Sequence, residues 1–148
     1  MKCVVFCLAA ALVLHAAPLT AQSRVTYDSV AIRHRAQVSR DACSIPASLK
    51  MKDSYQVASE HGSWSASVQE TDPVVVPYDQ ARACIQLRGR DGLRLGITLG
   101  DFRTLRIQWV NERLLYLSTD VGHVAGVGQL LDVEEMKWVY AMTQLYRQ

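Results

Sequence analysis

The sequence lacks the motifs that mark most enzymes. It contains neither the Gly-x-Ser-x-Gly turn of serine hydrolases nor an HExxH zinc helix, and no Lys-Ser or Lys-Thr follows its glycines as in a phosphate-binding loop. Three histidines outside the N-terminal stretch, His34, His61 and His123, show no metal-ligand spacing. The sequence therefore indicates no catalytic residue, no metal site and no cofactor, and it favours binding over catalysis.

A strong excess of one charge is also lacking. Lysine and arginine number 16 against 14 aspartates and glutamates, and this near-neutral balance argues against nucleic acid as a partner. One stretch gathers six arginines: Arg82, Arg88, Arg90, Arg94, Arg103 and Arg106. A patch for polyanions and a solvated strand face both fit these arginines. Because Asp79, Asp91 and Asp101 are interleaved with them, the strand face is favoured.

The N-terminus has the layout of an export signal. Lys2 precedes an almost wholly apolar stretch, residues 3–17, and Ala21 occupies a suitable cleavage position after Pro18. The apolar stretch is too short for a permanent membrane-spanning helix, so we predict a secretory signal peptide over residues 1–21. The single asparagine, Asn111, is not in a glycosylation acceptor. We expect an exported protein that is periplasmic or secreted.

Cysteine is scarce after the signal. Of the four cysteines, only Cys43 and Cys84 follow residue 21. Two cysteines in an oxidising compartment indicate a disulfide, whereas two alone do not complete a tetrahedral metal site. We expect a Cys43–Cys84 bond, which would stabilise the fold by about 4 kcal/mol in the chain-entropy model.

The remaining chain divides into an N-terminal segment and connector, residues 22–53, and an antiparallel β domain, residues 54–148, which together make one folded unit. Asp28 and Ser29 would cap a short helix that runs to Val38. Prolines restrict residues 71–79 to an edge strand or an extended loop. Alternating apolar residues predict strands over 55–57, 64–68, 83–87, 93–99, 105–109, 114–117 and 130–133.

The C-terminal piece, residues 136–148, fits two structures. As a strand, it places Met136, Trp138, Tyr140 and Met142 on one face; as a helix, it aligns Val139 with Met142 and Tyr146. Aromatic and β-branched residues favour the strand. The predicted fold is therefore mainly β, a small antiparallel meander curled into a barrel or sandwich with a short N-terminal helix. The alternative is an α+β fold with a C-terminal helix.

Residues 107–142 resemble a single blade of a β-propeller. A tryptophan ends one strand, a polar turn follows, an aliphatic strand returns, and an Asp-bearing strand precedes the last one. A closed propeller needs several blades, for which the chain is too short. The resemblance implies local antiparallel β topology and no functional residue.

Two places stand out as candidate sites. Trp64 follows His61 near a turn that has few other large apolar residues, so we expect Trp64 to be exposed and to contact a partner or a sugar together with His61. Asp120 and His123 share a glycine-rich loop and would serve as a general-base pair. Trp109 and Trp138 are expected in the core.

These observations favour an exported binding or inhibitor-type module, with an envelope protein, an extracellular protein or a glycan as its partner. The sequence also fits two alternatives. One is a small hydrolase that uses the Asp120–His123 loop, and the other is a structural component of the cell envelope.

Overall fold

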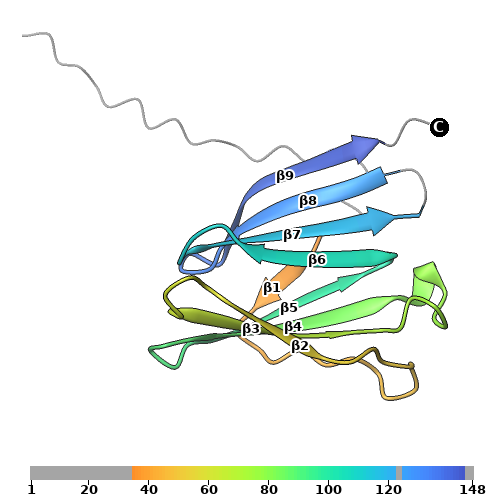
Figure 1. The fold of residues 1–148 in the computed structure, drawn as a ribbon, viewed down its shortest axis with the longest axis horizontal. Helices are drawn as coiled ribbons and strands as arrows, with labels where there is room; N and C mark the ends of the chain where they lie inside the picture. The colour runs from red at the N-terminus through yellow and green to blue at the C-terminus, as the bar shows by residue number, and fades with distance from the viewer. Residues whose placement is uncertain (1–34, 123–124, 146–148) are drawn as a thin grey trace, which may run out of the picture.

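The computed structural model describes residues 35–122 and 125–145, and it is mainly β-strand. Its strands make two antiparallel sheets that lie one above the other (Figure 1). No backbone ladder joins the two sheets within the described ranges. The predicted signal peptide and most of the predicted N-terminal helix lie outside these residues.

Sheet 1 has five strands in the order β1-β5-β4-β3-β2. They are β1 (Gln37–Ser39), β2 (Tyr55–Ala58), β3 (Trp64–Glu70), β4 (Arg82–Gly89) and β5 (Arg94–Gly100). A single 3-10 turn, η1 (Tyr78–Gln80), lies in the proline-bearing segment between β3 and β4. That segment is a loop, one of the two structures predicted for it. The prediction of a helix through Val38 is wrong at its end, because Val38 pairs with Ile97 of β5.

Sheet 2 follows chain order, β6-β7-β8-β9. Its strands are β6 (Thr104–Trp109), β7 (Leu114–Val121), β8 (Ala125–Asp132) and β9 (Lys137–Leu145). The predicted meander is confirmed, and β9 extends it by one strand. The α+β alternative is wrong, because the C-terminal residues pair with β8 along a ladder and form no helix up to Leu145.

The β4–β5 hairpin shows how the sequence directs the sheet. Leu95, Ile97 and Leu99 alternate with exposed or side-chain-free positions and face the core, as predicted. The turn uses Gly92 at a φ of 82°, a conformation that favours glycine. The Asp91 carboxylate accepts a 2.9 Å hydrogen bond from the Leu93 N–H and closes the turn.

The hydrophobic core lies between the two sheets. Its largest buried aliphatic side chains, the leucines and isoleucines, include six that are at most 1% exposed and come from β4, β5, β7 and β8: Ile85, Leu87, Ile97, Leu115, Leu117 and Leu131. Burial of each contributes roughly 1.5–3 kcal/mol to the free energy of folding. This shared core joins the sheets and leaves the outer face of each free to carry polar residues.

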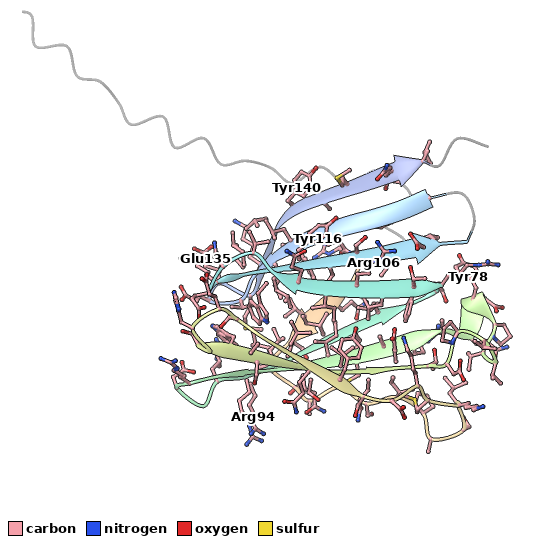
Figure 2. All side chains as sticks on the ribbon, in the orientation of Figure 1. Tyr78, Arg94, Arg106, Tyr116, Glu135 and Tyr140 are labelled. Atoms are coloured by element: carbon pink, nitrogen blue, oxygen red, sulfur yellow. A yellow bond between two sulfur atoms is a disulfide. The ribbon has the colours of Figure 1, made fainter. Side chains whose placement is uncertain are left out.

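Strand β9 departs from the predicted alternation. Leu131 pairs with Trp138 but Leu130 pairs with Tyr140, so a β-bulge at Val139 inserts one residue. Trp138 is 5% exposed and faces the core, whereas Tyr140 is 48% exposed and lies on the outer face of sheet 2 (Figure 2). The prediction that Trp138, Tyr140 and Met142 share a face is therefore wrong, because the bulge shifts the side-chain alternation by one residue.

Within the described ranges, no helix has the length and apolarity needed to cross a membrane.

Candidate functional site

The outer face of sheet 1 carries two parallel rows of polar side chains. The ladder sets Gln56 of β2 opposite Ser67 of β3, and Ser67 opposite Gln86 of β4. It sets Ser65, Arg88 and Arg94 side by side in the next row. Both rows point outward because the neighbouring residues in each strand enter the core. Figure 2 shows Arg94 extending from sheet 1 on the side away from sheet 2.

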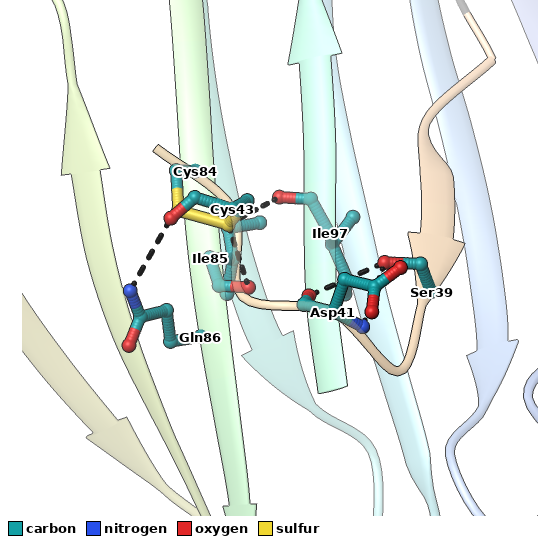
Figure 3. The surroundings of a disulfide bond; sticks show 7 residues. All are labelled: Ser39, Asp41, Cys43, Cys84, Ile85, Gln86 and Ile97. Carbon is teal, nitrogen blue, oxygen red and sulfur yellow. Dashed lines mark hydrogen bonds between the residues drawn. A yellow bond between two sulfur atoms is a disulfide. The ribbon is translucent and has the colours of Figure 1, made fainter. Parts of the chain in front are cut away.

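A crossing segment, residues 40–43, forms a wall over this face beside β5. A side chain at Gly96 would overlap the main-chain oxygen of Asp41 and approach the Cys43 nitrogen to 3.1 Å. Glycine at this position therefore permits the crossing. The Asp41 N–H also donates to the Ser39 hydroxyl at 3.1 Å, which shapes the bend that leads into the wall (Figure 3).

The predicted disulfide holds the wall in place. Cys43 and Cys84 are bonded with a Cα–Cα distance of 5.6 Å, which confirms the pairing. Cys84 lies on the outer face of β4 because the inward position beside it belongs to Ile85. The side-chain amide of Gln86 donates to the Cys43 carbonyl at 3.4 Å, next to the disulfide (Figure 3).

The wall and the two rows enclose an open hollow of about 350 Å³, which we call the arginine hollow. Its lining is Arg40, Asp41, Ala42, Gln56, Ser65, Ser67, Gln86, Leu87, Arg88, Arg94 and Leu95. Three of these residues are arginine and one is acidic, so the hollow carries a local net positive charge. The polar lining comes from four strands and a disulfide-bonded segment, which hold it in a defined arrangement.

The three arginines of the hollow differ from others in the chain. Arg88 and Arg94 lie directly opposite each other on β4 and β5, a placement of like charges that destabilises a sheet. Within the described ranges, no carboxylate lies within ion-pair distance of Arg40, Arg88 or Arg94. Arg82, by contrast, pairs with Asp101 at 3.0 Å. Sheet stability therefore does not account for the pair Arg88–Arg94.

Guanidinium groups suit one class of ligand. Each presents N–H donors in a planar fork that binds carboxylate, sulfate or phosphate through two parallel hydrogen bonds. The side chains of Arg40, Arg88 and Arg94 are exposed, so an anion reaches them from solvent without opening the core. The hollow is therefore suited to binding anions.

The structure divides the six arginines that the sequence groups together. Arg88 and Arg94 line the hollow, Arg82 pairs with Asp101, and Arg90 donates to the His61 carbonyl at the end of the molecule. Arg103 directly precedes β6, and Arg106 lies on β6, in the other sheet. The alternation of β4 and β5 was the signal that placed Arg88 and Arg94 on one face. No sequence signal brought Arg40 to them, because its position depends on the crossing segment.

Trp64 is not the exposed residue that the sequence predicts. Its side chain is 6% exposed, and its ring stacks on Trp109 with centroids 6.5 Å apart. The prediction of exposure is wrong because β3 points Trp64 toward the other sheet, where β6 supplies Trp109 to cover it. The Trp109 indole donates to the Val57 carbonyl at 3.1 Å and ties β6 to β2. Trp64 therefore helps to close the core.

His61 lies exposed in the turn between β2 and β3. Its main-chain N–H donates to the carboxylate of Glu112, which also accepts from the Ser59 hydroxyl at 2.7 Å and the Ser63 N–H at 3.1 Å. These hydrogen bonds, chiefly the one from His61, lower the pKa of Glu112 from 4.5 to about 2. Glu112 thus joins the turns of the two sheets and keeps its charge. A binding role for the His61 side chain stays a prediction.

The structure describes only one residue of the predicted Asp120–His123 general-base pair. Asp120 lies on the outer face of β7, where the Thr104 hydroxyl donates to its carboxylate. His123 lies outside the described residues, so the Asp120–His123 hypothesis stays a prediction. Within residues 35–122 and 125–145, no group of three or more histidine, cysteine, aspartate or glutamate side chains is placed to hold a metal ion.

Comparison with known proteins found no match for this chain among protein-family models, curated proteins or solved structures.

Proposed function

We propose that this protein is an exported binding module that takes an anionic ligand in the arginine hollow. The observation that carries the proposal is the pair Arg88–Arg94, two like charges opposite each other on neighbouring strands without an acidic partner in the described ranges. Such a pair costs the sheet stability, and a bound anion removes the repulsion between the two charges. The hollow beside the pair provides space for that anion.

The architecture suits a binding module. We infer that the two sheets form a sandwich, because a common core lies between them and both outer faces carry polar side chains. In such a fold, the strands hold the main chain beneath an outer face in place, so little backbone ordering is needed when a ligand binds. The hollow lies on one of these faces and is walled by the disulfide-bonded segment.

Export follows from the sequence pattern of residues 1–21 and agrees with the disulfide, which persists in oxidising compartments. The intact mass of the protein recovered from an envelope fraction and from culture fluid tests this part. We expect the mass of a chain that begins at Gln22 with both cysteines oxidised. Recovery of the full-length chain with free thiols would refute export.

Anion binding is tested by titration of the oxidised, exported protein, followed by NMR chemical shifts. The probes are inorganic phosphate, sulfate, citrate, an oligomer of galacturonic acid and a sulfated oligosaccharide. We expect at least one anion to saturate a single site at the arginine hollow, with affinity that falls as salt is added.

Two variants make this test specific. Arg88→Ala combined with Arg94→Ala removes the opposed pair, and we expect it to abolish saturable binding. Arg106→Ala is the matched control, since Arg106 is an exposed arginine on a strand of the other sheet. Equal binding by the double variant and the control, or no saturable binding of any probe by the parent, would refute the proposal.

A further inference from the structure

We infer that the ligand of the arginine hollow is an acidic oligosaccharide whose charged groups are carboxylates. The inference rests on the proposed anion-binding function and specifies its ligand. Three properties of the hollow carry it: its extent across the sheet, the neutral polar groups beside the arginines, and its low density of charge.

The extent of the hollow exceeds that of a compact anion. Its lining includes residues from β2, β3, β4 and β5. Neighbouring strands lie about 4.8 Å apart, so the site extends roughly 14 Å across the sheet. A single phosphate or sulfate contacts only a part of such a surface. An elongated ligand, with groups repeated along its length, contacts the whole of it.

The neutral row suits hydroxyl groups. Gln56 and Gln86 present amide groups and Ser67 presents a hydroxyl, so each both donates and accepts hydrogen bonds. A sugar ring carries several hydroxyls that also do both, whereas the oxygens of a phosphate chain mainly accept. The neutral row therefore matches a sugar chain better than it matches a polyphosphate.

The charges of the hollow are few and lie at its side. The lining contains three arginines, Arg40, Arg88 and Arg94, and one acidic residue, Asp41, which leaves a net charge of about two positive units. Carboxylate groups fit the planar guanidinium fork, and one carboxylate per sugar unit matches this density better than a heavily sulfated chain.

Other polymers fit less well. Single-stranded nucleic acids bind through aromatic side chains on which the bases stack, and the lining of the hollow contains none. Peptides bind along unpaired strand edges or insert apolar side chains into pockets. The hollow lies on the face of a sheet, and its leucines, Leu87 and Leu95, are buried in the core.

The test compares three ligands with the oxidised, exported protein by isothermal titration calorimetry and NMR shifts. They are an oligomer of galacturonic acid, the same oligomer with its carboxyl groups methyl-esterified, and inorganic phosphate. We expect the free acid to bind most tightly. The esterified oligomer keeps its ring hydroxyls but loses its charge, and we expect it to bind roughly tenfold or more weakly, as the loss of charge-assisted hydrogen bonds predicts.

Two variants assign the contacts. Gln56→Ala combined with Ser67→Ala removes neutral groups and keeps the charge, so we expect weaker binding of the free acid and unchanged binding of phosphate. Arg88→Gln combined with Arg94→Gln removes the charge, so we expect both to weaken. The thermal midpoint of each variant is measured to establish that it is folded.

The outcomes separate the two proposals. Tighter binding of phosphate, or of the sulfated oligosaccharide titrated to test the proposed function, lost in the arginine variant, would overturn the carboxylated-sugar inference and leave the anion-binding function standing. Equal affinity for the free acid and its methyl ester would also overturn the inference. Failure of every anion to bind would overturn both.

Discussion

Gly96 permits the wall of the arginine hollow. Residues 40–43 pass so close to it that a Cβ atom would overlap the Asp41 oxygen. Because main-chain atoms cannot rotate aside as a flexible side chain does, the crossing segment itself has to move if any other residue replaces this glycine. The reason for glycine here is close approach between backbones.

Substitution Gly96→Ala is expected to lower the free energy of unfolding by about 1–3 kcal/mol, as for other overpacked sites, and to weaken anion binding. Urea unfolding and the NMR titration measure the two effects. Thr98→Ala is the control, because Thr98 is an exposed position of the same strand that does not line the hollow. An unchanged affinity for anions in Gly96→Ala would contradict the importance of the wall.

Glu112 holds the ends of the two sheets together through a carboxylate that has to be ionised. Its pKa falls from 4.5 to about 2 because N–H and O–H groups of residues 59–63 donate to the charged form. A depressed carboxyl pKa means that the stabilisation is fully present above about pH 4.5 and is lost as the pH falls toward 2.

Replacement Glu112→Gln is therefore expected to reduce the free energy of unfolding above pH 4.5 and to make little difference near pH 2. Urea unfolding of the parent and the variant between pH 2 and 6 measures this convergence. Glu60→Gln is the control, since Glu60 is an exposed glutamate of the same turn. A stability difference that does not change with pH would show that the charge of Glu112 is not the cause.

At the scale of the element, β9 shows how one inserted residue changes which side chains of a strand lie on its outer face. The bulge at Val139 keeps Trp138 in the core and turns Tyr140 and Met142 to the outer face of sheet 2. Without the bulge, strict alternation would bring all three toward the other sheet.

The bulge predicts unequal effects for two aromatic truncations. Trp138→Ala removes a buried ring and is expected to cost about 3–5 kcal/mol. Tyr140→Ala removes a half-exposed ring from the outer face and is expected to cost only about 0.2–1 kcal/mol. Urea unfolding of both variants measures the difference, and similar costs would contradict the bulge.

At the scale of the whole molecule, the Cys43–Cys84 bond links a long irregular segment to the middle of sheet 1. Within residues 40–54, only an isolated bridge from Met51 to Thr71 resembles strand pairing. The disulfide therefore holds the N-terminal part of this segment to the sheet, and the same bond secures the wall of the arginine hollow.

Replacement of both cysteines by serine is expected to lower the free energy of unfolding by about 4 kcal/mol through the loss of loop closure in the unfolded chain. The affinity for anions should fall as well, because residues 40–43, which include Arg40, are no longer bonded to β4. Reduction of the parent should reproduce both effects, as measured by urea unfolding and NMR titration. Retention of full anion affinity after reduction would show that the wall is not part of the site.

Local pattern alone predicted most of the secondary structure. Alternating apolar residues predicted β4 and β5 with their shared turn, and the meander of β6, β7 and β8, because side chains that point to opposite faces of a sheet require a period of two. The two cysteines predicted the disulfide because few partners were available. These features depend on neighbours in sequence or on a count of residues.

Pairing between distant segments decided the rest. Trp64 was expected to be exposed because nothing near it in sequence covers it, yet Trp109 covers it from the other sheet. Arg40 joins Arg88 and Arg94 only because the chain crosses over Gly96, and no periodicity records such a crossing. For β4, β5 and β6, the sequence by itself determined which residues form strands and which face of each enters the core. The tertiary structure decided which outward residues meet, because that depends on sheet order and on chain crossings that local pattern does not specify.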